Sequence, residues 1–118
     1  MFGQTIRSVM EQKKLVTASP DTTVLRASEM MARRKVGAML VVENDRLAGI
    51  FTERDALFRV MAKRLDPATT TLVDVMTASP MTVSPDKSFG YALIVMHDNG
   101  FRHLPVVEDG KLIGIVSA

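Results

Sequence analysis

Thr52 and Asp55 stand three residues apart in the stretch GIFTERD, residues 49–55, where an apolar run gives way to charged residues. Threonine followed by an acidic residue at this spacing is the pattern of a capping box at the start of a helix. The same pattern suits a ligand, because free amides at a helix N-terminus attract a phosphate. The carboxylate one turn later can accept hydrogen bonds from vicinal hydroxyls such as those of ribose. The residues alone leave both interpretations open.

Other arrangements that could do chemistry are absent from the sequence. It contains no cysteine, and its two histidines, His97 and His103, have no carboxylates at a spacing that suits a metal. No phosphate-binding glycine loop and no nucleophile elbow occurs. Paired acidic residues such as Glu43 and Asp45 fall in expected hairpin turns. We therefore expect no catalytic residue, no metal site and no enzyme activity.

The composition is that of a soluble globular protein: 118 residues, 47% hydrophobic and 24% charged. A net charge of +2 with 5% aromatic residues does not favour nucleic-acid binding, which usually needs a basic patch interleaved with aromatics. Apolar stretches such as Ala38 to Val42 are too short to cross a membrane. No signal peptide is recognisable, so we expect a cytoplasmic protein without membrane contact.

An internal repeat organises the chain. Shifting the sequence by 65 positions aligns residues 16–53 with residues 81–118 without a gap, and twelve of these 38 pairs are identical. Residues 8–10 also match residues 74–76, at an offset of 66. Units of this size rarely fold alone, so two such repeats are expected to share a core and to pack with pseudo-two-fold symmetry, creating two equivalent clefts. The predicted division is a first repeat over 1–65, a linker over 66–71 and a second repeat over 72–118.

Each repeat predicts the same elements. A short strand, near Leu15 to Ala18 and near Met81 to Ser84, leads into a Ser-Pro-Asp turn. A helix follows, over residues 24–34 and 89–99, with Asn99-Gly100 as a stop signal. A hairpin comes next, over residues 38–51 and 103–116, with Asp109-Gly110 as its turn in the second repeat.

A last helix is expected only in the first repeat. It should run from Thr52 to about Arg64, and the sequence ends before its counterpart. Its apolar residues are expected to face the core at Leu57, Val60, Met61 and Leu65.

The order, spacing and duplication of Ser-Pro-Asp, Pro-Val-Val and Gly-Ile-x-Thr/Ser resemble a tandem pair of CBS domains, a Bateman module, over nearly the whole chain. The resemblance implies an α+β fold of two β-α-β-β-α repeats packed through their sheets, the second lacking its last helix. It also implies a regulatory sensor whose clefts bind an adenosine-containing ligand, AMP first, then NAD or ATP, and also ADP or S-adenosylmethionine.

Carried onto this chain, the resemblance implies a first cleft in which Asp55 holds the ribose and Thr52 a phosphate. Arg54 or Arg102 would neutralise the phosphate, with Arg59 and Lys63 as further candidates, and Met81 and Ile50 would sandwich the adenine. Core packing remains an alternative role for Met81. For His103, a general positioning role and a pH switch remain alternatives to a ligand contact. The first-cleft set is Ile50, Thr52, Arg54, Asp55, Pro80, Met81, Arg102, His103 and Leu104.

The second cleft is expected to be incomplete. Its ribose aspartate would fall at position 120, beyond the sequence, and Gly37 stands where the other repeat has Arg102. The two clefts should therefore differ in affinity or preference. The second-cleft set is Val16, Val36, Gly37, Ala38, Ile115 and Ser117.

The resemblance also favours a homodimer in which two chains pack their helices together, and an unidentified protein that the module regulates. Two alternatives stay open: a nucleic-acid-binding CBS pair, which pI 9.2 permits, and a purely structural dimerisation unit. Binding with a steep dependence on salt would identify the first. The intact Thr52 and Asp55 argue against the second.

Overall fold

A computed structural model describes residues 2–10 and 15–118, which form two compact α+β units. Unit 2 is one continuous stretch, Val16–Pro80. Unit 1 combines Met1–Leu15 with Met81–Ala118. The α+β class predicted from the sequence is confirmed, while the packing of the repeats through their sheets stays a prediction.

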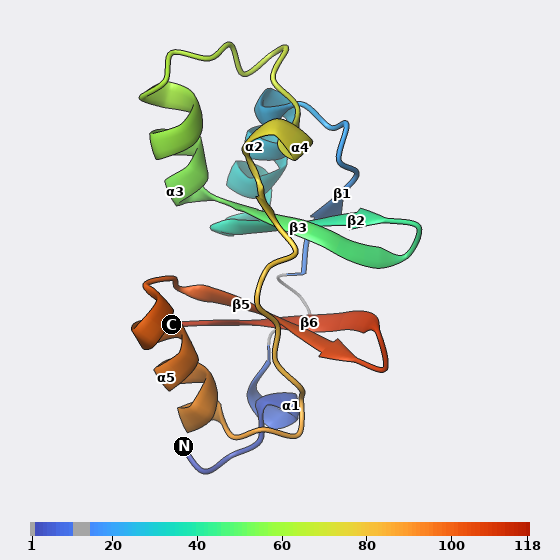
Figure 1. Ribbon diagram of the computed structural model, residues 1–118, viewed down its shortest axis with the longest axis vertical. Helices are drawn as coiled ribbons and strands as arrows, with labels where there is room; N and C mark the ends of the chain where they lie inside the picture. Colours follow the sequence, from blue (N-terminus) through green and yellow to red (C-terminus); the bar gives the residue numbers. More distant parts are fainter. Residues whose placement is uncertain (1, 11–14) are drawn as a thin grey trace. The chain divides into compact units, whose positions relative to one another are not determined.

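Unit 2 is a four-stranded sheet with its helices on one face (Figure 1). The strand order is β1-β2-β3-β4, in which β1 is parallel to β2 and the other neighbours are antiparallel. The elements are β1 (Thr17–Ala18), α2 (Val24–Arg34), β2 (Ala38–Glu43), β3 (Arg46–Thr52), α3 (Glu53–Asp55), η1 (Ala56–Met61), α4 (Leu72–Val75) and β4 (Thr77–Ala78).

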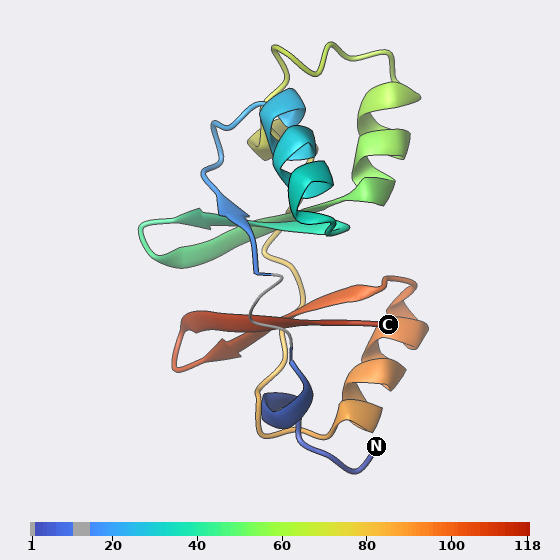
Figure 2. The same ribbon diagram turned by 180° about the vertical axis from the view of Figure 1, so that it is seen from behind.

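Unit 1 is built on a two-stranded antiparallel hairpin, with helices again on one face (Figure 2). Its elements are α1 (Ile6–Val9), α5 (Phe89–Asn99), β5 (His103–Glu108) and β6 (Lys111–Ser117). The strand expected near Met81 to Ser84 is reduced to a single parallel bridge between Val83 and Val106. Pro85, which has no backbone N–H, ends the pairing there. The strand expected near Leu15 to Ala18 shortens in the same way, ahead of Pro20.

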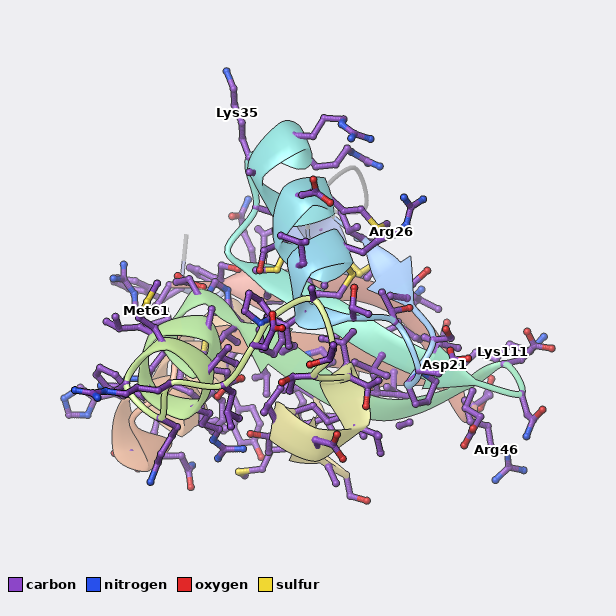
Figure 3. All side chains as sticks on the ribbon, turned by 90° about the horizontal axis from the view of Figure 1, so that it is seen from above. Asp21, Arg26, Lys35, Arg46, Met61 and Lys111 are labelled. Carbon is purple, nitrogen blue, oxygen red and sulfur yellow. The ribbon has the colours of Figure 1, made fainter. Side chains whose placement is uncertain are left out.

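The main helices confirm the bounds predicted from the sequence. The hydroxyls of Thr23 and Ser88 cap them by accepting hydrogen bonds from backbone amides three residues on, at 3.2 and 3.1 Å. Gly100, at φ 72°, ends α5 in the left-handed conformation as predicted. Asp109 and Gly110, at φ 51° and 79°, form the tight turn expected for the second hairpin. Lys35 ends α2 and projects from it (Figure 3).

The helix after Thr52 differs from the prediction. One α-helical turn, α3, passes into the π-helix η1, which closes with a bond from the Ala62 amide to the Leu57 carbonyl at 2.9 Å. Val60 is buried as predicted, but Leu57, Met61 and Leu65 are 54%, 71% and 42% exposed, so their expected core positions were wrong. Bonding five residues back widens each turn, and the three-to-four spacing used for the prediction then no longer selects one face.

The segment that precedes each repeat packs onto the other repeat. In unit 1 the amide of Ile6 donates to the Lys87 carbonyl at 2.8 Å, and in unit 2 the amide of Leu72 donates to the Thr22 carbonyl at 2.9 Å. Both side chains are fully buried. Each compact unit therefore combines segments that belong to both sequence repeats.

The predicted linker is an ordered part of unit 2. The carbonyls of Thr70 and Pro67 accept hydrogen bonds from the first two amides of α2, those of Val24 and Leu25, both at 2.9 Å. The Asp66 carboxylate accepts a further bond from the Ala68 amide at 2.9 Å. Residues 66–71 thus satisfy the end of a helix whose amides have no partner within it.

An ion-pair network adds to the attachment of α1. Arg7 pairs with Glu108 and with Asp86, at 3.3 Å for the latter. Hydrogen bonds to Glu108 and then to Asp86 raise the pKa of the Arg7 guanidinium. The matching residue of α4 is Val73, so this network belongs to unit 1 alone.

Each hairpin carries a glycine where another segment crosses it closely. A Cβ atom at Gly49 would lie 2.9 Å from the Thr77 carbonyl and closer still to the Met76 sulfur. At Gly114 a Cβ atom would lie 2.8 Å from the Met10 sulfur. The contact with the Thr77 backbone explains the glycine at position 49, whereas at Gly114 the neighbour is a flexible methionine side chain.

Substitution of Ile6 by alanine tests the role of the exchanged segment. Ile6 lies in the core of unit 1 with Val83, Met96 and Leu104, so Ile6→Ala should lower the free energy of unfolding by about 2–5 kcal/mol. Urea unfolding followed by circular dichroism measures this change. Val73→Ala, which truncates a side chain 53% exposed, is the control and should change it by about 0.5 kcal/mol or less. Equal effects of the two variants would contradict the burial of Ile6.

Candidate functional site

Thr52 and Asp55 form the capping box that their spacing predicts. The Asp55 amide donates to the Thr52 hydroxyl oxygen at 3.4 Å, and the Thr52 amide donates to Asp55 Oδ2 at 2.9 Å. The Thr52 hydroxyl also lies 3.3 Å from Oδ2 and donates to it. The capping interpretation is therefore confirmed, and it holds both side chains at the end of β3.

The Asp55 carboxylate keeps acceptor capacity beyond the capping box. Asp55 is the only charged residue that is buried among those described, with its side chain 12% exposed. Oδ2 receives the two bonds from Thr52, and Oδ1 lies 3.5 Å from Nε of Arg59. A carboxylate offers about four lone-pair sites, so the capping box does not prevent Asp55 from accepting a hydroxyl of a ligand.

Arg59 ties Asp55 to the segment that follows α4. Its Nη1 donates to the Met76 carbonyl at 3.1 Å and to the Val75 carbonyl at 3.3 Å. The sequence offered Arg59 only as a phosphate contact. Its link to α4 was missed because the accepting carbonyls lie 16 and 17 residues further along the chain.

The other members of the first-cleft set in unit 2 have different surroundings. Ile50 is 7% exposed. The Arg54 guanidinium lies 5.5 Å from the centre of the Phe58 ring, a cation–π distance, on the same helix as Asp55. Pro80 is half-buried at the end of the unit.

The members in unit 1 gather at the start of β5. Arg102 is exposed, and its Nη2 donates to the Ala118 carbonyl at 3.4 Å. His103 Nδ1 lies 3.0 Å from the Ser117 hydroxyl, directly across the hairpin. Leu104 is fully buried, which leaves its backbone as the part that could meet a ligand. Met81 is 49% exposed, so the alternative of core packing for this residue was wrong.

The second-cleft set is also divided between the units. In unit 2, Val16 and Ala38 are buried at 3%, and Val36 and Gly37 are half-buried. Ile115 in unit 1 is buried at 4%, and Ser117 is exposed but hydrogen-bonded to His103. The structure brings residues of each set together within a unit, and the two clefts that would join the units stay predictions.

The Glu53 carboxylate lies against Gly37, a contact that the sequence did not predict. The Glu53 amide donates to the Gly37 carbonyl at 3.0 Å. A Cβ atom at Gly37 would lie 2.6 Å from the Glu53 carboxylate. A side chain at position 37 would therefore displace Glu53, so this corner of the second-cleft set carries a carboxylate where the other repeat carries Arg102.

Among residues 2–10 and 15–118 no three side chains of the types His, Cys, Asp and Glu are grouped in a way that could hold a metal ion. No helix in the same part of the chain is long and apolar enough to cross a membrane.

The chain is similar to known proteins of one family. The family model of the CBS domain matches residues 6–62 and 72–118. The CBS domain-containing protein CBSCBSPB1 of Arabidopsis thaliana is 34% identical over 118 residues, which are 98% of this chain and 22% of that protein. The chain therefore spans less than a quarter of the length of this curated relative.

Two solved structures share the fold. A proposed signal-transduction protein with CBS domains from Burkholderia ambifaria MC40-6 matches with a TM-score of 0.88 and 34% identity, over 95% of this chain and 84% of that one. A CBS domain protein of Pyrobaculum aerophilum, solved in complex with AMP, matches with a TM-score of 0.87 and 24% identity, over 96% and 86%. At the latter identity the likeness is one of fold.

The family match covers both copies of the internal repeat, and it includes the Gly-Ile-x-Thr/Ser motif of each copy. The chain therefore belongs to the CBS domain family and carries two CBS repeats.

Proposed function

We propose that this chain is a regulatory module that binds an adenosine-containing nucleotide between its two repeats and signals its presence to a partner. AMP is the first candidate, followed by NAD and ATP. The observation that carries the proposal is the buried Asp55 carboxylate, which retains acceptor capacity next to the Thr52 hydroxyl. A catalytic role is not part of the proposal.

Each residue of the first-cleft set would contact a different part of the ligand. Asp55 would accept hydrogen bonds from the ribose hydroxyls, which are strengthened by its charge. Thr52 would contact a phosphate, and Arg54 or Arg102 would neutralise it. Ile50 and the exposed Met81 would cover the two faces of the adenine, while Pro80, His103 and the backbone of Leu104 would complete the wall.

The second-cleft set would bind more weakly or prefer another ligand. It offers the Ser117 hydroxyl at the position equivalent to Thr52. The carboxylate of Glu53 lies against Gly37, where the first cleft would have the guanidinium of Arg102. A negative group at this position would disfavour a phosphate.

A homodimer is the assembly that we propose. The face of η1 presents Leu57, Phe58 and Met61, which are 54%, 53% and 71% exposed, and Met61 projects from the helix in Figure 3. Apolar side chains gathered on one exposed helix favour burial against another surface. A second copy of the chain supplies a matching face, because a two-fold interface uses the same patch twice. We place the protein in the cytoplasm, in line with its lack of cysteine.

Thermal unfolding with AMP, ADP, ATP, NAD, NADH and S-adenosylmethionine tests ligand binding. A ligand at about 100 times its Kd should stabilise the fold by about 2.7 kcal/mol and raise Tm by several degrees. Asp55→Asn, which keeps the shape of the side chain, should remove most of this shift by removing the charge. Asp45→Asn, in the exposed turn between β2 and β3, should leave the shift unchanged.

Two results would contradict the nucleotide-binding proposal. One is the absence of a shift with every compound. The other is a shift that Asp55→Asn preserves in full. Either result would favour a structural dimerisation unit, or a nucleic-acid-binding pair if oligonucleotides bound with a steep dependence on salt.

Light scattering on eluting protein tests the dimer. Phe58→Asp places a charge on the exposed face of η1 and should convert a dimer into a folded monomer, because the side chain is 53% exposed within the chain. Leu25→Asp, on the exposed side of α2 at 43%, is a matched control and should leave the mass unchanged. A wild-type protein that elutes as a monomer at all concentrations would contradict the proposal.

A further inference from the structure

Arg59 makes three polar contacts that the proposed ligand contacts do not use. Its Nε lies 3.5 Å from Asp55 Oδ1, and its Nη1 donates to the carbonyls of Met76 and Val75 at 3.1 and 3.3 Å. The guanidinium is planar and its donors are fixed in a fork, so the contacts made at one end restrict the direction of the other. The contacts are all within unit 2 and include its buried carboxylate.

The carbonyl side of this link is suited to a cation. Val75 and Met76 end the short helix α4, where carbonyls lack partners within the helix and carry partial negative charge. The side chain of Arg59 is half-exposed, whereas that of Asp55 is 12% exposed, so the arginine approaches the carboxylate from the solvent side. The two contacts with α4 hold it in that approach.

The π-helix contributes to the geometry. Asp55 ends α3 and Arg59 lies four residues later in η1, the segment in which bonding shifts to five residues back. Such segments are rare and are frequent at functional sites. Here the widened turn carries an arginine that reaches both the preceding carboxylate and the end of α4.

We propose that Arg59 is the positioning residue of the nucleotide site, which fixes the orientation of the Asp55 carboxylate for the two ribose hydroxyls and ties it to the segment after α4. The inference rests on the proposed function, because it assigns Asp55 to a ribose. Asp55 Oδ2 is already held by Thr52, so the direction of Oδ1 is the one that Arg59 sets. A ribose hydroxyl that binds Oδ1 shares this oxygen with Arg59. Ligand binding therefore also alters the hydrogen bonds from Arg59 to the carbonyls of Val75 and Met76.

The test compares AMP with 2′-deoxy-AMP by calorimetric titration. The wild-type protein should bind AMP about tenfold more tightly than 2′-deoxy-AMP, because the deoxy compound lacks a hydroxyl that would bond to a charged carboxylate. Arg59→Gln should reduce this preference to about twofold while still binding both compounds, because a misdirected carboxylate contacts the ribose poorly. Asp55→Asn should reduce it in the same way, and the double variant should lose nothing further, as expected for residues that act together.

Controls separate positioning from a general loss of structure. Arg59→Lys keeps the charge without the fork and should restore only part of the preference. Arg33→Gln, which removes an exposed arginine of α2, should leave the preference at the wild-type value. Thermal unfolding establishes that each variant is folded before its titration.

Hydrogen exchange of the Met76 amide provides a second readout. This amide bonds to the Leu72 carbonyl at 2.8 Å, directly beside the carbonyls that Arg59 holds. AMP should change its exchange rate in the wild-type protein and should leave it unchanged in Arg59→Gln at saturating ligand. A merely structural arginine would alter the rate without making it depend on the ligand.

The outcomes are distinguishable. A preference for AMP that Arg59→Gln leaves at the wild-type value, or an equal loss of affinity for both compounds, overturns the role of Arg59 while the proposed function stands. Wild-type protein that binds neither compound overturns the proposed function, and the role of Arg59 falls with it.

Discussion

The exchange of short segments between the repeats is the constraint on which the rest of the structure depends. Ile6 precedes the first repeat, but it is fully buried in the core of unit 1, which holds the second repeat. Leu72 precedes the second repeat, but it is fully buried in the core of unit 2, which holds the first. Each brings a helical turn whose amides bond to the Ser-Pro-Asp turn region of the receiving unit. The same crossing brings Met76 and Met10 against Gly49 and Gly114, and the backbone of Thr77 against Gly49 leaves room there only for glycine.

The site inherits its geometry from this crossing. Asp55 is placed by a local signal, the capping box, but Arg59 reaches the carboxylate while bonded to the end of α4. The segment exchanged between repeats therefore contacts Arg59, which in turn pairs with the residue proposed to bind ribose. A charged side chain that is only 12% exposed needs compensating partners, and these are Thr52 at the end of β3 and Arg59 in η1.

The parts that could be predicted from the sequence are those encoded locally. The bounds of α2 and α5 are correct because capping residues and a positive-φ stop mark both ends. The hairpins are correct because turn residues separate apolar runs. The capping box could be predicted from Thr52 and Asp55 alone. The internal repeat predicts which elements of the two halves are equivalent. It does not predict into which unit the segment that precedes each repeat packs.

Other features depend on contacts far along the chain. The inward face assigned to Leu57, Met61 and Leu65 assumed an α-helical period, which η1 does not follow. The contact between Glu53 and Gly37 joins residues that the repeat alignment treats as unrelated. Met81 falls in an expected strand, yet that strand is reduced to one bridge at Val83 and Met81 is 49% exposed.

The discontinuity of unit 1 has a consequence for synthesis from the N-terminus. Unit 2 is one stretch, Val16–Pro80, so every part of it is synthesised before β5 and β6 of unit 1. Ile6 is synthesised before unit 2, but its core partners, among them Leu104 and Val116, follow unit 2 in the sequence. An apolar helical turn therefore lacks its core partners until the segment after unit 2 has been synthesised.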